Sequence, residues 1–446
     1  MTGRDRLQMW LPRRDSMARL GAPLVAAVGA ATHPAASRAE LADGVASLEP
    51  LRIAAVEAFV IRTPPDRIAF DAPFELPPIG YLTEGRGLSR RLDHASPSRF
   101  KGYEQATLVR ITTDSGLVGW GECHAPAAPR MHQMIVTDLL APILRGQDAR
   151  AILPLWERMY TSERVRGYST GAHLEAIAGA DLALWDLLGK ALRVPVYRLL
   201  GGKCRDGIPL YVGVGGATPD ELAERARQAL ARGIRMVKMS LRKGAGTEDF
   251  SRVAAVSEAM GTEGQVSVDS LGGFRLFEAI RVGRELDRLG NVGFFEDALL
   301  LDDMAAYPAL AGAISTPVCT GEPFSNRFQF RDLLEQRGAD LINPDVCRAG
   351  GVTECLRIAQ LADTYGVPWT PHVSTGTALY FAASLHLAVA TPGCFIMEGG
   401  NKLDAAFGNR LLREPLPVRD GIAYVTDRPG FGVEFDPDAL QAVTVG

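Results

Sequence analysis

The sequence predicts an α/β protein that consists of a (β/α) barrel preceded by an α+β domain and a short leader. The chain has 446 residues, which is too long for one ordinary domain. From about residue 208 onward, short apolar runs alternate with helical stretches, a pattern typical of a barrel. The eight runs are LYVGV, MVKMS, QVSVD, GFFED, PVCTG, DLINP, VPWTP and CFIME. A doubly wound parallel sheet is the alternative, because periodicity does not reveal strand order.

The first 45 residues differ from the rest of the chain. Arg13 and Arg14 precede an uncharged stretch of small and apolar residues, and a small-x-small cleavage pattern ends at Ala39. This arrangement resembles a twin-arginine export signal, so we expect a periplasmic protein. The apolar stretch is too short for a permanent membrane span. A disordered leader on a cytoplasmic protein is the alternative.

Residues 51–195 carry β-rich runs followed by helical ones, which predicts an α+β domain. The runs ATLVRITT and GLVGWGE flank Asp114 and Ser115, whose turn chemistry predicts a hairpin. Residues 67–103 are rich in Pro, Gly and Arg and show little periodicity. This segment is long for a passive connection, and we interpret it as a lid that contributes to specificity.

The composition favours small-molecule chemistry. The formal net charge of -4 provides no basic field for nucleic acid, so no nucleic-acid partner is expected. The six cysteines are scattered without a CxxC pair, which argues against a zinc site or a disulfide framework.

Acidic residues close three successive strands of the expected barrel. Asp269, Glu296 and Glu322 end the third, fourth and fifth apolar runs, and the active site of a barrel lies at the C-terminal ends of its strands. Carboxylates gathered there need a cation or protons, and three oxygen ligands from separate strands suit Mg²⁺. For any one of them, a helix N-cap or a surface ion pair is an equally good explanation.

The remaining strand ends supply a base and further charges. His372 follows the seventh run and Asp345 follows the sixth, so the carboxylate is expected to fix the imidazole tautomer of a general base. Lys238 lies on the second run and Glu398 closes the eighth. A His at a strand end that serves only packing or metal binding is the alternative for His372.

Several segments resemble those of the enolase superfamily, in particular the mandelate racemase / muconate lactonizing enzyme family. They are LVGWGE, DLALWDLLGKALRVPVYRLLGG, the TGE of the fifth run and NPDVCRAGGVTE. The resemblance extends from about residue 51 to the C-terminus. It implies a capping domain at 51–195, a modified TIM barrel of (β/α)₇β form at 196–410, a segment at 411–446 that packs back on the cap, and a homo-oligomer.

The resemblance also assigns roles by position. It implies that Asp269, Glu296 and Glu322 bind Mg²⁺ and that His372 and Asp345 form the catalytic pair. It further implies that Lys238 and Glu398 act on the carboxylate of a small-molecule substrate.

One departure from the family pattern bears on the reaction. The second strand reads Lys238-Met239-Ser240, and Ser240 stands where a second Lys usually serves as the base on the other face. Because an unactivated hydroxyl is a poor base, a single His is expected to act, which favours dehydration of an acid sugar to a 2-keto-3-deoxy acid. A racemase or epimerase with Lys238 as second base and a non-catalytic binding protein are the alternatives. Ser240, Tyr81 and Arg86 are the expected substrate contacts, and a solvated, flexible loop is the alternative for Arg86.

Overall fold

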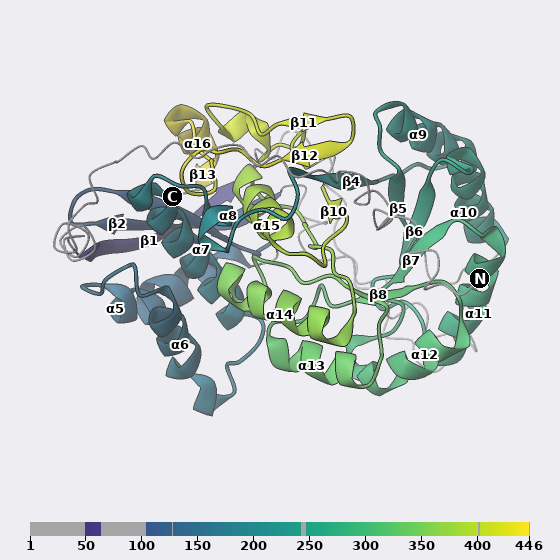
Figure 1. Cartoon of the computed structure of the whole chain (residues 1–446), viewed down its shortest axis with the longest axis horizontal. Helices are drawn as coiled ribbons and strands as arrows, with labels where there is room; N and C mark the ends of the chain where they lie inside the picture. Colours follow the sequence, from purple (N-terminus) through teal and green to yellow (C-terminus); the bar gives the residue numbers. More distant parts are fainter. Residues whose placement is uncertain (1–49, 64–103, 127, 242–246, 400–401, 446) are drawn as a thin grey trace, which may run out of the picture.

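The computed structural model describes residues 50–63, 104–126, 128–241, 247–399 and 402–445. The expected leader and the segment 67–103, with Tyr81 and Arg86, lie outside the described residues. An antiparallel sheet with its helices lies on one side of the molecule, and parallel strands surrounded by helices lie on the other (Figure 1).

The capping domain contains three antiparallel strands, β1 (Ile53–Arg62), β2 (Gln105–Thr113) and β3 (Val118–Cys123). The predicted hairpin joins β2 to β3, and Gly116 closes its turn with φ of 81° and an N–H···O bond of 2.9 Å to Thr113. The glycines of LVGWGE have a packing reason. A Cβ on Gly121 would collide with the carbonyl oxygen of Gly179, so β3 approaches the long helix α7 more closely than any side chain allows.

Helices cover this sheet. They are α4 (Pro129–Met134), the π-helical η5 (Ile135–Leu140), α5 (Ala141–Leu144), α6 (Ile152–Ser162), the short η6 (Arg164–Arg166), α7 (Ala172–Leu192) and α8 (Val196–Leu199). Helix α7 is buried along most of its length because it packs on the sheet on one side and on the barrel helix α14 on another.

The barrel strands follow one another in chain order and pair in parallel. They are β4 (Gly207–Gly213), β5 (Met236–Ser240), β6 (Gln265–Asp269), β7 (Val292–Glu296), β8 (Val318–Thr320), β9 (Leu341–Ile342) and β10 (Met397–Glu398). Because β10 pairs with β4, the order returns to its start, as in a barrel and unlike a doubly wound sheet. The seventh predicted run makes single bridges only, from Trp369 to Ile342 and to Cys394. Pro368 and Pro371 flank Trp369 and have no N–H to donate to a regular ladder.

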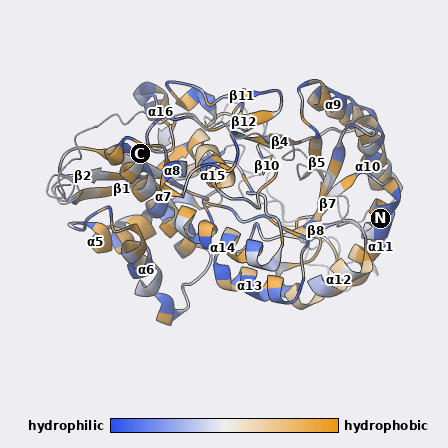
Figure 2. Cartoon of the chain, viewed as in Figure 1, coloured by the Kyte–Doolittle hydropathy of each residue, from blue (hydrophilic) through white to orange (hydrophobic). Residues whose placement is uncertain are grey.

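Helices alternate with these strands on the outside of the barrel (Figure 1). They are α9 (Pro219–Ala231), α10 (Thr247–Met260), α11 (Leu276–Leu289), η7 (Leu301–Ala306), α12 (Tyr307–Ala313), α13 (Arg327–Glu335), α14 (Gly351–Tyr365) and α15 (Ala378–Ala390). Figure 2 shows apolar and polar residues interspersed along outer helices such as α9 and α10, as expected for helices with one face against the barrel. None of the helices within the described ranges is both long and apolar enough to span a membrane.

The C-terminal segment contacts both domains. After η8 (Asn409–Leu411), the hairpin of β11 (Val418–Arg419) and β12 (Ile422–Tyr424) pairs antiparallel with β4 of the barrel. Helix α16 (Pro437–Val443) then leads to β13 (Thr444–Val445), which pairs antiparallel with β1 of the cap. The sequence indicated only the contact with the cap, because two-residue strands carry no periodic signal.

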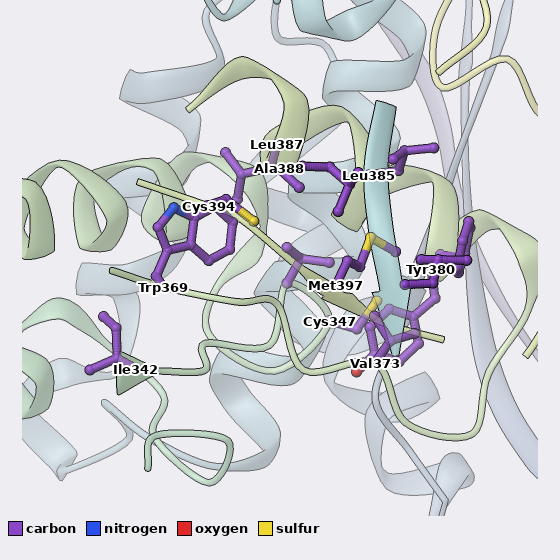
Figure 3. Packing of buried hydrophobic residues seen from close by; sticks show 14 of the residues in the cluster. Ile342, Cys347, Trp369, Val373, Tyr380, Leu385, Leu387, Ala388, Cys394 and Met397 are labelled. Carbon is purple, nitrogen blue, oxygen red and sulfur yellow. The ribbon is translucent and has the colours of Figure 1, made fainter. Parts of the chain in front are cut away.

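The last part of the barrel is held by side-chain packing where its backbone pairing is sparse. Trp369, Cys394 and Met397 are buried against α15, whose Leu385 and Ala388 face them (Figure 3). This packing fixes the loop that carries His372.

Candidate active site

The C-terminal ends of the strands bring seven polar side chains to one mouth of the barrel. Asp269, Glu296 and Glu398 are the last residues of β6, β7 and β10. Glu322, Asp345 and His372 lie just beyond β8, β9 and the bridged residue Trp369. Lys238 from β5 is the seventh. These side chains form ion pairs and hydrogen bonds with one another.

Three of these carboxylates form a cluster suited to a metal ion. One oxygen each from Asp269, Glu296 and Glu322 lies within 4.8 Å of the other two. Hydrogen bonds orient two of them. The N–H of Leu271 donates to Asp269 Oδ1 at 3.0 Å, and Asn343 Nδ2 donates to Glu296 Oε1 at 2.8 Å. Among the described residues, the buried Glu296 Oε2 has no partner other than the Lys238 ammonium, which forms an ion pair with it. A hard divalent cation is the group that three converging carboxylate oxygens fit best.

Lys238 supplies positive charge beside this cluster. Its Nζ lies 3.5 Å from Asp269 Oδ2 and 3.1 Å from both Glu296 Oε2 and Glu398 Oε1. Burial lowers the pKa of Lys238, but Glu296 and Glu398 outweigh that effect and place the pKa well above its usual range. Lys238 is therefore a fixed cation and a poor proton acceptor.

His372 and Asp345 make the predicted contact. His372 Nδ1 lies 2.7 Å from Asp345 Oδ2. The other carboxylate oxygen, Asp345 Oδ1, accepts a hydrogen bond from the N–H of Cys347 at 2.8 Å. Since the carboxylate only accepts, Nδ1 carries the proton and Nε2 faces the mouth. Tyr380 also donates its hydroxyl to Asp345. The carboxylate is thus held from three directions.

The far nitrogen of His372 faces the acidic cluster. Nε2 lies 3.0 Å from Glu322 Oε2 and 3.9 Å from Glu398 Oε2. Burial lowers the pKa of His372, but Glu322 and the hydrogen bond to Asp345 outweigh it and raise the pKa well above its usual range. If the negative charge of Glu322 is neutralised, the larger of the two effects that raise the pKa of His372 disappears. The pKa of His372 then falls, and the imidazole approaches the neutral form that a base requires.

Glu398 is charged in this arrangement. Burial raises the pKa of Glu398, but the positive charges of Lys238 and His372 lower it by more. The net result is a pKa below its usual value. The N–H of Val373 donates to Glu398 Oε2 at 3.1 Å. Glu398 is therefore a hydrogen-bond acceptor in this arrangement.

The predicted substrate contacts are less well placed. Ser240 ends β5, opposite Asp269 in the register, and its side chain is exposed. Tyr81 and Arg86 lie outside the described residues. Leu271, which follows Asp269 by two positions, is 51% exposed and adopts φ of 49°, an unusual value for a residue with a side chain. That conformation directs its N–H to Asp269.

Sequence reasoning missed several residues around the mouth. His124 follows β3 of the cap and lies 3.0 Å, through Nδ1, from Arg348 Nη2. Arg348 also donates through Nη1 to the carbonyl oxygen of Glu322 at 2.7 Å. Tyr380 belongs to α15, which is buried on all sides and therefore shows no polar face in the sequence. These contacts join residues from distant segments, and no local pattern indicates them.

The fold and this geometry define a (β/α)₇β barrel with a carboxylate cluster and a His–Asp pair at its mouth, covered by an α+β domain. Comparison with known proteins agrees with this description. Residues 99–201 match the family profile "Mandelate racemase / muconate lactonizing enzyme, N-terminal domain", and residues 221–439 match "Enolase C-terminal domain-like".

Individual relatives span most of the chain. D-galactonate dehydratase from Verminephrobacter eiseniae is 34% identical over 341 residues, which cover 74% of this chain and 88% of that protein. D-galactarolactone cycloisomerase from Agrobacterium fabrum is 33% identical over 371 residues, which cover 79% of this chain and 95% of that protein. The structure of 3,6-anhydro-D-galactonate cycloisomerase from Zobellia galactanivorans matches with a TM-score of 0.74 at 28% identity, covering 89% of this chain and 100% of that one.

This chain belongs to the mandelate racemase / muconate lactonizing enzyme family of the enolase superfamily. The predicted family and the predicted capped barrel are confirmed.

Proposed function

We propose that this protein dehydrates an acid sugar to a 2-keto-3-deoxy acid. The observation that carries the proposal is the single His372–Asp345 pair beside the carboxylate cluster, with the exposed Ser240 at the strand end where a second base would stand. The D-galactonate dehydratase relatives support the same reaction class.

The chemistry requires one base and positive charge. We propose that Asp269, Glu296 and Glu322 hold Mg²⁺, which would supply positive charge to the substrate carboxylate as that group gains negative charge. Lys238 adds a fixed cation on the same side, and its neighbours keep it protonated. Asp345 keeps the proton of His372 on Nδ1, so that Nε2 is the atom that accepts the α-proton.

Elimination then needs only the same imidazole. The α-carbon loses its proton to His372 Nε2, the bond from the β-carbon to its hydroxyl breaks, and the hydroxyl leaves as water with a proton from His372. The resulting enol becomes the ketone. One group acts as base and then as acid, which agrees with a site in which Ser240 offers no basic side chain.

The test is incubation of purified protein and Mg²⁺ with a library of acid sugars that includes D-galactonate. Formation of a 2-keto-3-deoxy acid is the expected result. In D₂O, exchange of the α-proton without a keto product would reject dehydration in favour of racemisation or epimerisation with Lys238 as second base. Binding of a ligand that depends on Mg²⁺, without exchange or product, would instead indicate a non-catalytic binding protein.

A matched variant locates the base. His372→Asn keeps a polar group of similar size but removes the basic nitrogen, and kcat should fall by about 10²- to 10⁴-fold. Affinity for Mg²⁺, measured by calorimetry, should stay within a few-fold of the wild-type value. A variant that retains wild-type turnover would exclude His372 as the base.

Cycloisomerisation is the second candidate, because two relatives are named cycloisomerases. The same library should therefore include a sugar lactone and an anhydro sugar acid. A ring-changed product of unchanged mass would favour this reaction over loss of water.

Two further proposals concern the cell and the assembly. We propose that the twin-arginine pattern in residues 1–45 directs export to the periplasm, and that the protein is a homo-oligomer. A reporter fused to residues 1–45 that stays in the cytoplasm would contradict the first. Light scattering that gives the mass of one chain, 47.9 kDa, would contradict the second.

A further inference from the structure

The capping domain reaches the catalytic pair through the end of β3. The carboxylate of Glu122 is 1% exposed and accepts three hydrogen bonds from Thr377. The N–H of Thr377 lies 3.0 and 3.2 Å from the two oxygens, and its hydroxyl lies 2.5 Å from Oε2. Thr377 ends the loop that begins at His372 and caps α15 by accepting the N–H of Leu379.

The next residues of the cap hold the other half of the pair. The N–H of His124 donates to the carbonyl oxygen of Cys347 at 3.0 Å, and its ring accepts from Arg348. Cys347 in turn donates its N–H to Asp345. The turn that carries Asp345 therefore rests on the cap, as does the loop that carries His372.

The space around Glu122 leaves little freedom for this loop. A Cβ on Gly376 would lie 2.5 Å from both Glu122 Oε1 and the ring of Tyr380. Tyr380 is the residue whose hydroxyl contacts Asp345, and it also accepts the N–H of Ser374 at 3.2 Å. Glu122 is thus tightly packed against the loop and the tyrosine that contact the catalytic pair.

We propose that Glu122 and His124 form a clamp by which the capping domain positions His372 against Asp345. Glu122 is a positioning residue, since it acts through Thr377 and touches neither reacting atoms nor the carboxylate cluster. The catalytic role of His372 comes from the proposed function, but the geometric claim about the His372–Asp345 hydrogen bond does not depend on it.

Glu122→Gln is the first test. It replaces one acceptor oxygen by an NH₂ group, which cannot accept a hydrogen bond, so at least one of the three hydrogen bonds from Thr377 is lost. We expect kcat to fall roughly 10- to 100-fold, as for a misplacement of about 1 Å, with KM and Mg²⁺ affinity within about twofold of wild type. The downfield imidazole proton of the His372–Asp345 hydrogen bond, assigned with His372→Asn, should broaden or disappear in the ¹H NMR spectrum. His124→Phe, which removes the acceptor for Arg348, should weaken the same signal.

Trp185→Phe is the matched control. Trp185 Nε1 donates to Thr353 Oγ1 at 2.9 Å, a cap-to-barrel hydrogen bond that does not involve the catalytic loops. This variant should lower the melting temperature without changing kcat or the imidazole signal. If Trp185→Phe reduces kcat and the imidazole signal as much as Glu122→Gln does, these contacts only dock the cap on the barrel, and the proposal fails.

Variants of Thr377 decide the question if Glu122→Gln does not fold. Thr377→Ser keeps the hydroxyl and should behave as wild type, whereas Thr377→Val loses it and should reproduce the loss of kcat and of the imidazole signal. Equal behaviour of the two variants would overturn the proposal. If no acid sugar is turned over by the wild type, but the imidazole signal still depends on Glu122, the proposed reaction falls and the clamp stands.

Discussion

Two groups of buried carboxylates in this molecule have opposite surroundings. At the interface between cap and barrel, each acid faces donors: Asp181 accepts the N–H and the hydroxyl of Thr353 at 2.9 and 2.6 Å. Glu354 accepts from Arg327 at 2.9 and 2.6 Å and from Arg357 at 3.2 Å. At the barrel mouth, oxygens of Asp269, Glu296 and Glu322 converge on one another, with Lys238 and His372 as the cations beside them.

The difference separates structure from function. A buried acid with its full set of donors contributes to stability or is neutral, and removing it leaves those donors without a partner. Acids that face acids repel one another and are retained only if something else binds there. Burial alone, which both groups share, does not distinguish the two roles.

The largest expected effect is on the mouth. Glu296→Gln should reduce Mg²⁺ affinity by at least about 100-fold, since loss of a group that only hydrogen-bonds to a metal ligand already costs about 10- to 100-fold. The unfolding free energy without metal should change by less than about 1 kcal/mol, because the repulsion that is removed offsets the lost ion pair with Lys238. Calorimetric titration and denaturant unfolding measure the two quantities. Unchanged Mg²⁺ affinity would show that the cluster is not the metal site.

Glu354→Gln should give the opposite pattern at the interface. Glu354 is 0% exposed and pairs with two arginines, so neutralising it should lower the unfolding free energy by about 2–3 kcal/mol. Mg²⁺ affinity should be unaffected. A stable variant with weakened metal binding would contradict the division between the two groups.

The sequence predicted the mouth better than the interface. Apolar runs mark the barrel strands, so the residues that end them, such as Asp269, Glu296 and Glu398, could be located by periodicity alone. The adjacent sixth and seventh runs also predicted the pairing of His372 with Asp345, and the family segments then supported it. Glu122 lies inside the family segment LVGWGE, but its partner Thr377 is 255 positions away, and no local pattern indicates a contact across that separation.

The seventh strand shows a second limit. Its apolar run was recognisable, but flanking prolines reduce it to single bridges, and packing around Trp369 replaces the missing ladder. Packing of this kind depends on side chains from the whole fold. The sequence therefore places His372 at the mouth of the barrel but leaves the conformation of its loop undefined.

Asp181 offers a pH test of the interface. Burial raises the pKa of Asp181 to about 7, in spite of the hydrogen bonds from Thr353. The folded state therefore keeps this proton up to about pH 7, whereas the unfolded chain loses it near pH 4. Stability from this group is complete below about pH 4 and is lost as the pH rises through about 7.

Asp181→Asn removes this dependence. As the pH rises from about 5 to about 7, the unfolding free energy of the variant should increase relative to that of the wild type by on the order of 2 kcal/mol. Denaturant unfolding at each pH measures this difference. Other groups, such as the buried His386 with its pKa lowered to about 3, titrate in both proteins and cancel in the difference. A difference that does not vary with pH would mean that Asp181 is ionised throughout.

The smallest effect is expected at Ser240, which sharpens the limits of the mouth. Ser240 pairs with Asp269 in the register, yet its side chain is exposed, and an unactivated hydroxyl does not accept a proton at neutral pH. Ser240→Ala should therefore change kcat less than about twofold, because the exposed hydroxyl supplies neither a base nor a charge to the reaction. A fall of about tenfold or more in kcat, with KM unchanged, would assign the hydroxyl a part in the transition state. The active part of the mouth would then extend to the end of β5, and the hydroxyl would contribute a hydrogen bond to the transition state, not a second base.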